Sequence, residues 1–155
     1  MIKKELRLFP KNYFVIVEKF TQTAAAAAYV GFGDPDAEKY LDDNNITVLN
    51  CIIRFPLSKE CSFQIKIPDG KDYFFLPDVV VAICNKYREI YAEEDATSSI
   101  KAENLPKLIN RNVTNGKWGI KYHYLDELII NDLVLDTSTN TIEISYSTRP
   151  SPSHR

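Results

Sequence analysis

The hydrophobic and polar positions along this chain form two kinds of pattern. In several short stretches, apolar and β-branched residues dominate or alternate with polar ones, which is typical of strands. One longer stretch repeats its apolar residues at helical spacing. The predicted strands cover residues 5–9, 12–20, 46–55, 61–67, 72–76, 117–124, 128–135 and 141–147.

The helical pattern predicts one main amphipathic helix over about residues 77–94. Pro77 and Asp78 suit its first turn, because proline needs no hydrogen-bonded N–H there and an acid favours the positive end of the helix dipole. The apolar face comprises Val80, Ile83, Cys84, Tyr87, Ile90 and Tyr91. We interpret this face as core packing against a sheet rather than as a groove for a partner.

Two shorter helices are expected before the main one. The alanine run Ala24–Ala28 has the best intrinsic helix propensity, and Gly31 supplies a stop, so a helix is expected near residues 24–30. Asp34 can cap a second helix with Pro35 in its first turn, over about residues 35–42.

Turn residues join some of the predicted strands into hairpins. Pro68–Lys71 lies between the strands 61–67 and 72–76, and Ser138–Asn140 lies between 128–135 and 141–147. The sequence therefore predicts an α+β fold, in which an antiparallel sheet built from hairpins carries the main helix on one face. Residues 1–147 are expected to form a single domain, and the proline- and serine-rich residues 148–155 an extended, unpacked tail.

The composition of the chain excludes some classes of function but does not indicate a particular one. The chain has 155 residues, 45% of them hydrophobic and 26% charged, enough for one domain with a real core. Its net charge of −2 is too small for a general attraction to nucleic acid or to an anionic membrane. The apolar run Tyr13–Val17 is too short for a membrane span or a signal peptide. We therefore expect an intracellular, cytoplasmic protein with no membrane partner.

The cysteines and histidines do not predict a metal site. Cys51, Cys61 and Cys84 are widely spaced without a CxxC pair, and the chain has two histidines. We expect three free thiols in a reducing compartment, with Cys84 as a small buried hydrophobic residue, and neither a cofactor nor a bound metal.

A basic and aromatic segment is the strongest candidate for a binding surface. Within Lys117–Tyr124, aromatic and apolar side chains alternate with polar ones, as in a half-buried strand. Cations mixed with rings are also how proteins hold single-stranded nucleic acid, but rings that face the core cannot stack on bases. Tyr, Trp and Arg are equally typical of protein interfaces, which we favour. The candidate binding residues are Trp118, Lys121, His123 and Arg111.

Catalysis has one candidate residue in the predicted domain, His123. A small hydrolase or transferase would pair it with Cys51, Cys61 or a carboxylate inside a concave pocket. The acidic run Glu93–Asp95 is expected to be a solvated face. Since sequence alone brings no such partner next to His123, the enzyme hypothesis ranks below protein binding.

A resemblance concerns the string NRNVTNGKWGI at residues 110–120, followed by His123 and Leu125–Leu128. It is similar to a segment of uncharacterised small proteins of large DNA viruses, covers about a fifth of the chain and implies no activity. The resemblance favours a component of a larger assembly, such as a viral one, within a virion or the cytoplasm. Our leading hypothesis is a non-enzymatic protein that binds other proteins or itself; a small hydrolase or transferase and a nucleic acid binder are the alternatives.

Overall fold

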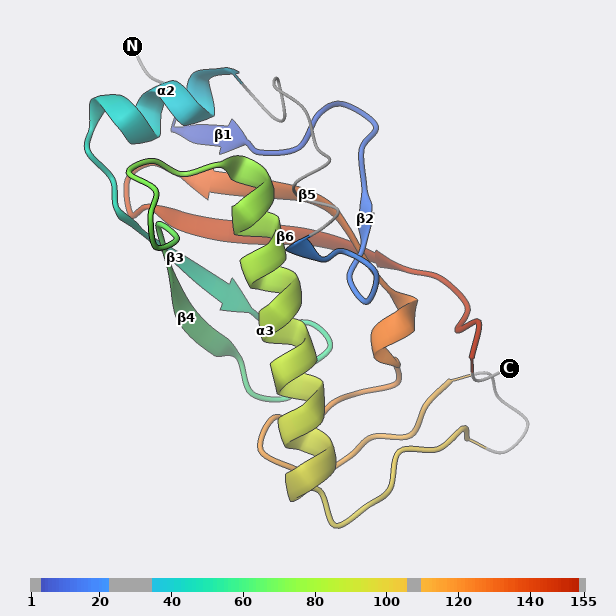
Figure 1. The fold of residues 1–155 in the computed structure, drawn as a ribbon. Helices are drawn as coiled ribbons and strands as arrows, with labels where there is room; N and C mark the ends of the chain where they lie inside the picture. Colours follow the sequence, from blue (N-terminus) through green and yellow to red (C-terminus); the bar gives the residue numbers. More distant parts are fainter. Residues whose placement is uncertain (1–3, 23–34, 106–109, 154–155) are drawn as a thin grey trace.

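The structure of the chain is a computed structural model that describes residues 4–22, 35–105 and 110–153 (Figure 1). Within these ranges the chain forms one six-stranded sheet, two α-helices and one 3-10 turn. The α+β class predicted from the sequence is confirmed. The expected helix near residues 24–30 lies outside the described residues.

The sheet places the strands in the order β1-β5-β6-β3-β4, and β2 pairs with another part of β5. Both termini of the chain contribute to it, because β1 and β2 precede the helices and β5 and β6 follow them (Figure 1). The strands are β1 (Glu5–Arg7), β2 (Val15–Ile16), β3 (Val48–Ile53), β4 (Cys61–Lys66), β5 (Leu128–Asp136) and β6 (Thr141–Thr148).

The hairpin predicted at the C-terminal end of the chain is confirmed. β5 and β6 pair antiparallel from Leu128 opposite Thr148 to Asp136 opposite Thr141. The register shifts by one residue between Ile130 and Asp132, which is a β-bulge. In the turn, Asn140 takes a positive φ of 53°, a conformation that asparagine tolerates better than most residues.

Two features of the predicted sheet are wrong. The sheet is mixed, because β3 runs parallel to β6, with Asn50 opposite Thr141. In addition, β4 does not pair with residues 72–76; it pairs with β3 along its whole length, from Val48 opposite Lys66 to Ile53 opposite Cys61. Residues 72–75 are not a strand, and Phe74 packs into the core from the connection to the main helix.

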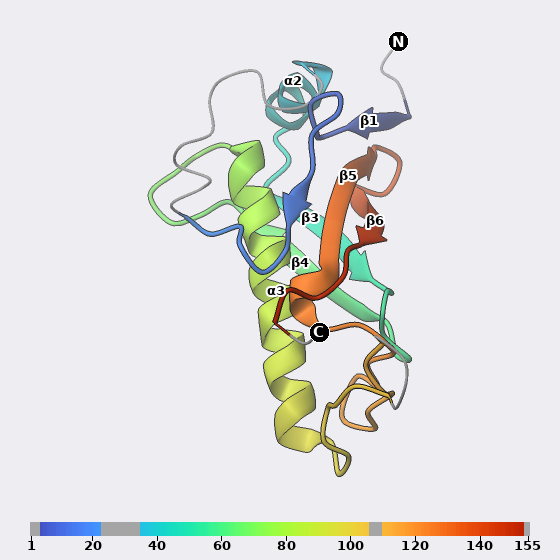
Figure 2. The same ribbon diagram turned by 90° about the vertical axis from the view of Figure 1, so that its right-hand side faces the viewer.

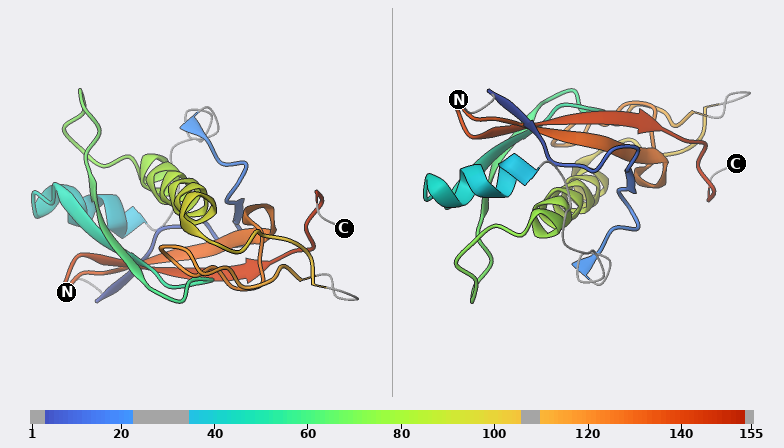
Figure 3. Two further views of the ribbon diagram at one scale, coloured as in Figure 1. Left: turned by 90° about the horizontal axis from the view of Figure 1, so that it is seen from below. Right: turned by 90° about the horizontal axis from the view of Figure 1, so that it is seen from above.

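The main helix, α3 (Leu76–Thr97), is slightly longer than predicted and lies across one face of the sheet (Figures 2 and 3). Its apolar side chains join those of the strands in a single hydrophobic cluster. Tyr87 also donates a hydrogen bond to the carbonyl of Phe55, 3.0 Å away. The opposite face of the sheet carries exposed polar side chains, among them Asn50, Gln64 and Glu143, which fits contact with water.

The shorter helix α2 (Pro35–Asp43) begins and ends close to the predicted positions and lies on the same side of the sheet as α3 (Figure 3). The Tyr40 hydroxyl fixes it to the β5–β6 turn, 3.0 Å from the Thr137 carbonyl oxygen and 2.8 Å from Asn140 Oδ1. Because Ala37 and Leu41 are buried on the same face, the helix closes this end of the core.

The C-terminal tail is not unpacked where it leaves β6. Arg149 donates its backbone N–H to the Glu127 carbonyl oxygen and its Nε to the Asp126 carbonyl oxygen, over 2.9 and 2.8 Å. Ser151 is buried, and its hydroxyl lies 2.7 Å from Asp126 Oδ1. The start of the tail therefore packs against the 3-10 turn (Leu125–Glu127) that precedes β5.

Candidate functional site

The candidate residues lie in the long segment between α3 and β5, and one carboxylate holds much of this segment in place. Glu94, in the last turns of α3, is fully buried. Its two oxygens accept five hydrogen bonds of 2.7 to 3.3 Å from the segment 114–120. The donors are the Thr114 hydroxyl and the backbone N–H groups of Gly116, Trp118, Gly119 and Ile120.

These hydrogen bonds decide the charge of Glu94. Burial of the carboxyl group disfavours its ionised form, but the Thr114 hydroxyl and the backbone N–H groups outweigh that penalty and lower its pKa. Glu94 is therefore a carboxylate at neutral pH, and the expectation that Glu93–Asp95 is a solvated face is wrong at its central residue.

The Glu94 contacts also explain why the predicted strand 117–124 does not form. Successive N–H groups converge on one carboxylate, whereas a strand would direct them alternately to its two sides. Gly119 and Tyr122 adopt positive φ angles of 64° and 66°, which end any extended run. A β-bridge between Ile120 and Leu57, together with backbone hydrogen bonds from Ser58 and Lys59 to the Trp118 carbonyl oxygen, connects this part of the segment to the β3–β4 connection.

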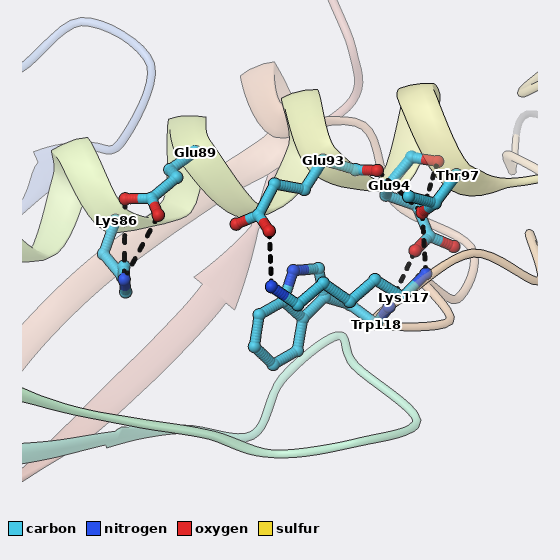
Figure 4. Close-up of polar contacts among 7 residues, drawn as sticks. All are labelled: Lys86, Glu89, Glu93, Glu94, Thr97, Lys117 and Trp118. Atoms are coloured by element: carbon cyan, nitrogen blue, oxygen red, sulfur yellow. Dashed lines mark hydrogen bonds and ion pairs between the residues drawn. The ribbon is translucent and has the colours of Figure 1, made fainter.

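Trp118 and Lys117 lie along α3 (Figure 4), Trp118 partly buried and Lys117 with an exposed side chain. The Lys117 ammonium is 2.6 Å from Glu93 Oε2 and 5.1 Å from the centre of the Trp118 ring. The backbone N–H of Lys117 donates to the Thr97 hydroxyl over 2.8 Å. Lys117 is thus neutralised by an acid of the helix, and the half-buried Trp118 ring packs against the core.

Arg111 is only 1% exposed, so it is not part of a surface patch. Its guanidinium carbon lies 5.5 Å from the centre of the Tyr91 ring and 5.7 Å from that of Tyr124. It donates hydrogen bonds to the Thr114 hydroxyl (3.1 Å) and the His123 carbonyl oxygen (3.4 Å). The cations that are close in sequence therefore do not form one basic surface.

Lys121 and His123 do come together, at a pocket of about 450 Å³ that we call the aromatic pocket. Lys121 lies at its exposed rim, and Tyr122 beside it is 47% exposed. The rings of Phe55 and Tyr146, 5.2 Å apart, form part of the wall. The full lining is Arg54, Phe55, Pro56, Leu57, Lys121, Tyr122, His123 and Tyr146.

His123 has an acidic neighbour. Its Nδ1 is 3.4 Å from Glu127 Oε1, and its ring centre lies 5.4 Å from that of Phe55. Glu127 is buried, and its other carboxylate oxygen accepts the backbone N–H of Tyr124 over 2.5 Å. This arrangement fixes the carboxylate and gives it one orientation toward the imidazole.

The cysteines do not support thiol catalysis. All three are free and buried, as predicted for Cys84. Burial, the largest effect in each case, raises the pKa of Cys51 and of Cys84 to about 12 and also raises that of Cys61. Thiols with such values stay protonated at neutral pH, and among the described residues no hydrogen bond joins His123 to a cysteine.

Sequence analysis missed several residues of the site. Phe55 and Tyr146 were assigned only to predicted strands, and Pro56 and Leu57 to no element, yet these four residues form half of the lining of the aromatic pocket. Nothing in the sequence pattern distinguishes Glu94 from the acidic residues on either side of it. A bend in residues 116–124 was indicated only by Gly116 and Gly119.

In the ranges that the structure covers, no three His, Cys, Asp or Glu side chains cluster as a metal site would require. The helices found there are too short or too polar to traverse a lipid bilayer. Comparisons with models of protein families, with curated proteins and with solved structures gave no match. The geometry of the two residues that meet at the aromatic pocket therefore carries the functional argument.

Proposed function

We propose that this chain is a non-enzymatic protein-binding subunit, and that its aromatic pocket receives an apolar side chain from an acidic segment of a partner protein. The observation that carries this proposal is Tyr122. A non-glycine residue at a φ of 66° costs about 1–2 kcal/mol, and Tyr122 is 47% exposed, so side-chain packing within the chain offsets little of that cost. Strained residues of this kind concentrate at functional sites.

The strain is imposed by neighbouring backbone contacts. The Lys121 N–H donates to the Pro56 carbonyl oxygen over 2.8 Å, and the Tyr122 carbonyl oxygen accepts the Arg111 N–H over 3.2 Å. These bonds hold Tyr122 in one orientation before a partner binds. A tyrosine on a backbone fixed in advance loses less conformational freedom on binding, and tyrosine is common at the energetic centre of interfaces.

The charges around the pocket favour an acidic partner segment. Arg54, at one side of the pocket, already pairs with Glu60 and Glu143, at 3.2 and 2.8 Å. Lys121 is exposed and makes no ion pair with any described residue. A carboxylate of the partner near Lys121 would complete the polar rim, while an apolar side chain contacts Phe55 and Tyr146.

The test is a selection of short random peptides on the immobilised protein, followed by affinity measurements on the selected peptides. We expect enrichment of sequences with an acid next to an aromatic or large aliphatic residue. Lys121→Glu should weaken their binding by about tenfold or more, and Tyr122→Ala by a similar factor. The matched control is Lys66→Glu, which makes the same charge change at the far end of the β3–β4 hairpin. Equal affinity for all four proteins would contradict the proposal.

Membership of a larger assembly extends the same proposal. The similarity of residues 110–128 to small proteins of large DNA viruses favours an assembly component, and the aromatic pocket includes three residues of that stretch, Lys121, Tyr122 and His123. A nucleic acid partner is disfavoured, because Arg111 is buried and Lys117 is paired with Glu93.

A second candidate function rests on His123 and Glu127. His123 lines a pocket, and the buried Glu127 carboxylate lies 3.4 Å from its Nδ1. In general-base catalysis a carboxylate in this position orients the histidine that accepts the proton. Among the residues that the structure describes, no serine, threonine or cysteine lines this pocket, so water would be the nucleophile. Wild-type hydrolysis of an activated ester such as p-nitrophenyl acetate should then exceed that of both His123→Ala and Glu127→Gln. Equal rates for the three proteins would eliminate this candidate and leave peptide binding unaffected.

A further inference from the structure

A second cavity, of about 680 Å³, lies beside the C-terminal end of α3 and shares no lining residue with the aromatic pocket. Its volume falls within the range of small-molecule sites. Its walls combine apolar side chains with charges of both signs. The lining consists of Glu18, Tyr91, Asp95, Ser98, Ser99, Ile100, Lys101, Ala102, Arg111, Tyr124, Leu125 and Asp126.

Arg111 is the unusual member of this wall. A guanidinium keeps its charge at any physiological pH, and this one is almost fully removed from water. Its hydrogen-bond acceptors are neutral, the Thr114 hydroxyl and the His123 carbonyl oxygen. Its Nε is buried and has no acceptor in the described part of the chain. Among the described residues no carboxylate reaches it directly; Glu94 is linked to it only through the Thr114 hydroxyl.

A buried cation with an unused donor is costly unless something compensates it. The rings of Tyr91 and Tyr124 flank the guanidinium and offer part of that compensation. A ligand carboxylate would provide the rest, because two parallel N–H···O bonds to a guanidinium are among the strongest polar contacts in proteins. Arg111 is therefore positioned as an anchor for an anionic group.

The acids of the cavity restrict what that anion can be. Glu18, Asp95 and Asp126 line the same cavity, against the cations Lys101 and Arg111. A dianion such as phosphate would be repelled by the acids, whereas a molecule with one carboxylate and one ammonium group satisfies both signs. Ile100, Ala102 and Leu125 leave room for an apolar side chain.

We propose that this cavity binds a small zwitterionic molecule of the dipeptide class, with its carboxylate on Arg111 and its ammonium group toward Asp95. The site is independent of the aromatic pocket, so either one can exist without the other. Tyr91 and Tyr124 shield the carboxylate–guanidinium pair from water, which strengthens it.

The test uses glycyl-leucine as the probe and the Arg111 Nε–H resonance as the readout, since a buried Nε–H gives its own signal in ¹H–¹⁵N spectra. Glycyl-leucine should shift this resonance with saturation. Glycyl-leucinamide, which lacks the carboxylate, and N-acetyl-glycyl-leucine, which lacks the ammonium group, should each bind at least about tenfold more weakly. Inorganic phosphate should bind more weakly still.

Variants at the rim test the arrangement without removing the buried anchor. Asp95→Asn should weaken glycyl-leucine binding about threefold or more and leave the acetylated dipeptide unchanged or tighter. Glu89→Gln, an exposed acid two turns earlier on α3 that does not line the cavity, is the matched control and should change neither. Phosphate binding as tight as the dipeptide, or an Arg111 resonance that no probe shifts, would overturn the proposal.

Discussion

Glu94 has a larger effect on this structure than any neighbouring charge, because five hydrogen bonds from residues 114–120 end on its carboxylate. Glu94→Gln keeps the shape but replaces one oxygen by an NH₂ group that faces N–H donors. The buried N–H groups of Gly119 and Ile120 donate to different oxygens of Glu94, so in either orientation of the amide one of them faces the NH₂ group and loses its acceptor. We expect the free energy of unfolding to fall by about 2–3 kcal/mol in urea denaturation.

The same variant has a pH signature. The pKa of Glu94 is lower in the folded chain than its ordinary value of 4.5, so its contribution is fully present above pH 4.5. That contribution is lost as the pH falls through the lower, folded pKa, because the unfolded chain then binds the proton first. Unfolding of the wild type should therefore show a steeper loss of stability below pH 4.5 than unfolding of Glu94→Gln. Parallel curves would mean that Glu94 is not the buried carboxylate described above.

The sequence identifies residues of this kind poorly. Glu93, Glu94 and Asp95 are adjacent acids near a helix end, and of the three only Glu94 is buried. Arg111 likewise resembles its exposed basic neighbours in sequence, although it is buried between two tyrosines. By contrast, Cys84 was predictable, since its place on the apolar face of a helix determines its burial.

At the scale of elements, sequence patterns that depend only on nearby residues predicted helices and one hairpin correctly. The α3 and α2 helices and the β5–β6 hairpin follow from local spacing, capping and turn residues. The segments 72–76 and 117–124 had strand-like composition, but composition does not say which strand is available as a partner. β4 pairs with β3, and Glu94 takes the N–H groups of the second segment.

The conformation of the 114–120 segment can be tested with a matched pair of glycines. Gly119 and Gly70 both have positive φ angles, of 64° and 84°. An added Cβ at Gly70 would meet nothing within 4 Å, whereas at Gly119 it would lie 2.8 Å from Cβ and Oγ of Ser58. Both substitutions to alanine should cost about 1–2 kcal/mol for the backbone, and Gly119→Ala at least about 1 kcal/mol more for the overlap. Chemical denaturation that gives equal losses would show that the segment does not lie against Ser58.

At the scale of the whole molecule, the parallel contact between β3 and β6 joins the two halves of the chain. It places the β3–β4 hairpin beside the β5–β6 hairpin, so that α3 covers strands of both (Figures 1 and 2). Hairpins alone predict antiparallel neighbours, and nothing local in β3 or β6 indicates that they meet in the parallel sense. The aromatic pocket depends on this contact, because Phe55 follows β3 and Tyr146 belongs to β6.

A single core predicts a single unfolding transition, and the chain carries a convenient reporter for it. Trp118 is the one tryptophan in the sequence, and it lies in the segment that Glu94 attaches to α3. If that attachment is as strong as five hydrogen bonds to a buried carboxylate imply, the segment should not open before the sheet and the helix do. Tryptophan fluorescence and far-ultraviolet circular dichroism should then give the same urea midpoint and the same m-value.

In Glu94→Gln the fluorescence midpoint should move below the circular dichroism midpoint, because the segment loses its attachment while α3 keeps its packing on the sheet. If the fluorescence transition of the wild type already precedes the loss of helix, the 114–120 segment unfolds separately from the sheet and α3. Lys121 and Tyr122 would then lack the rigid support on which the proposed partner binding depends.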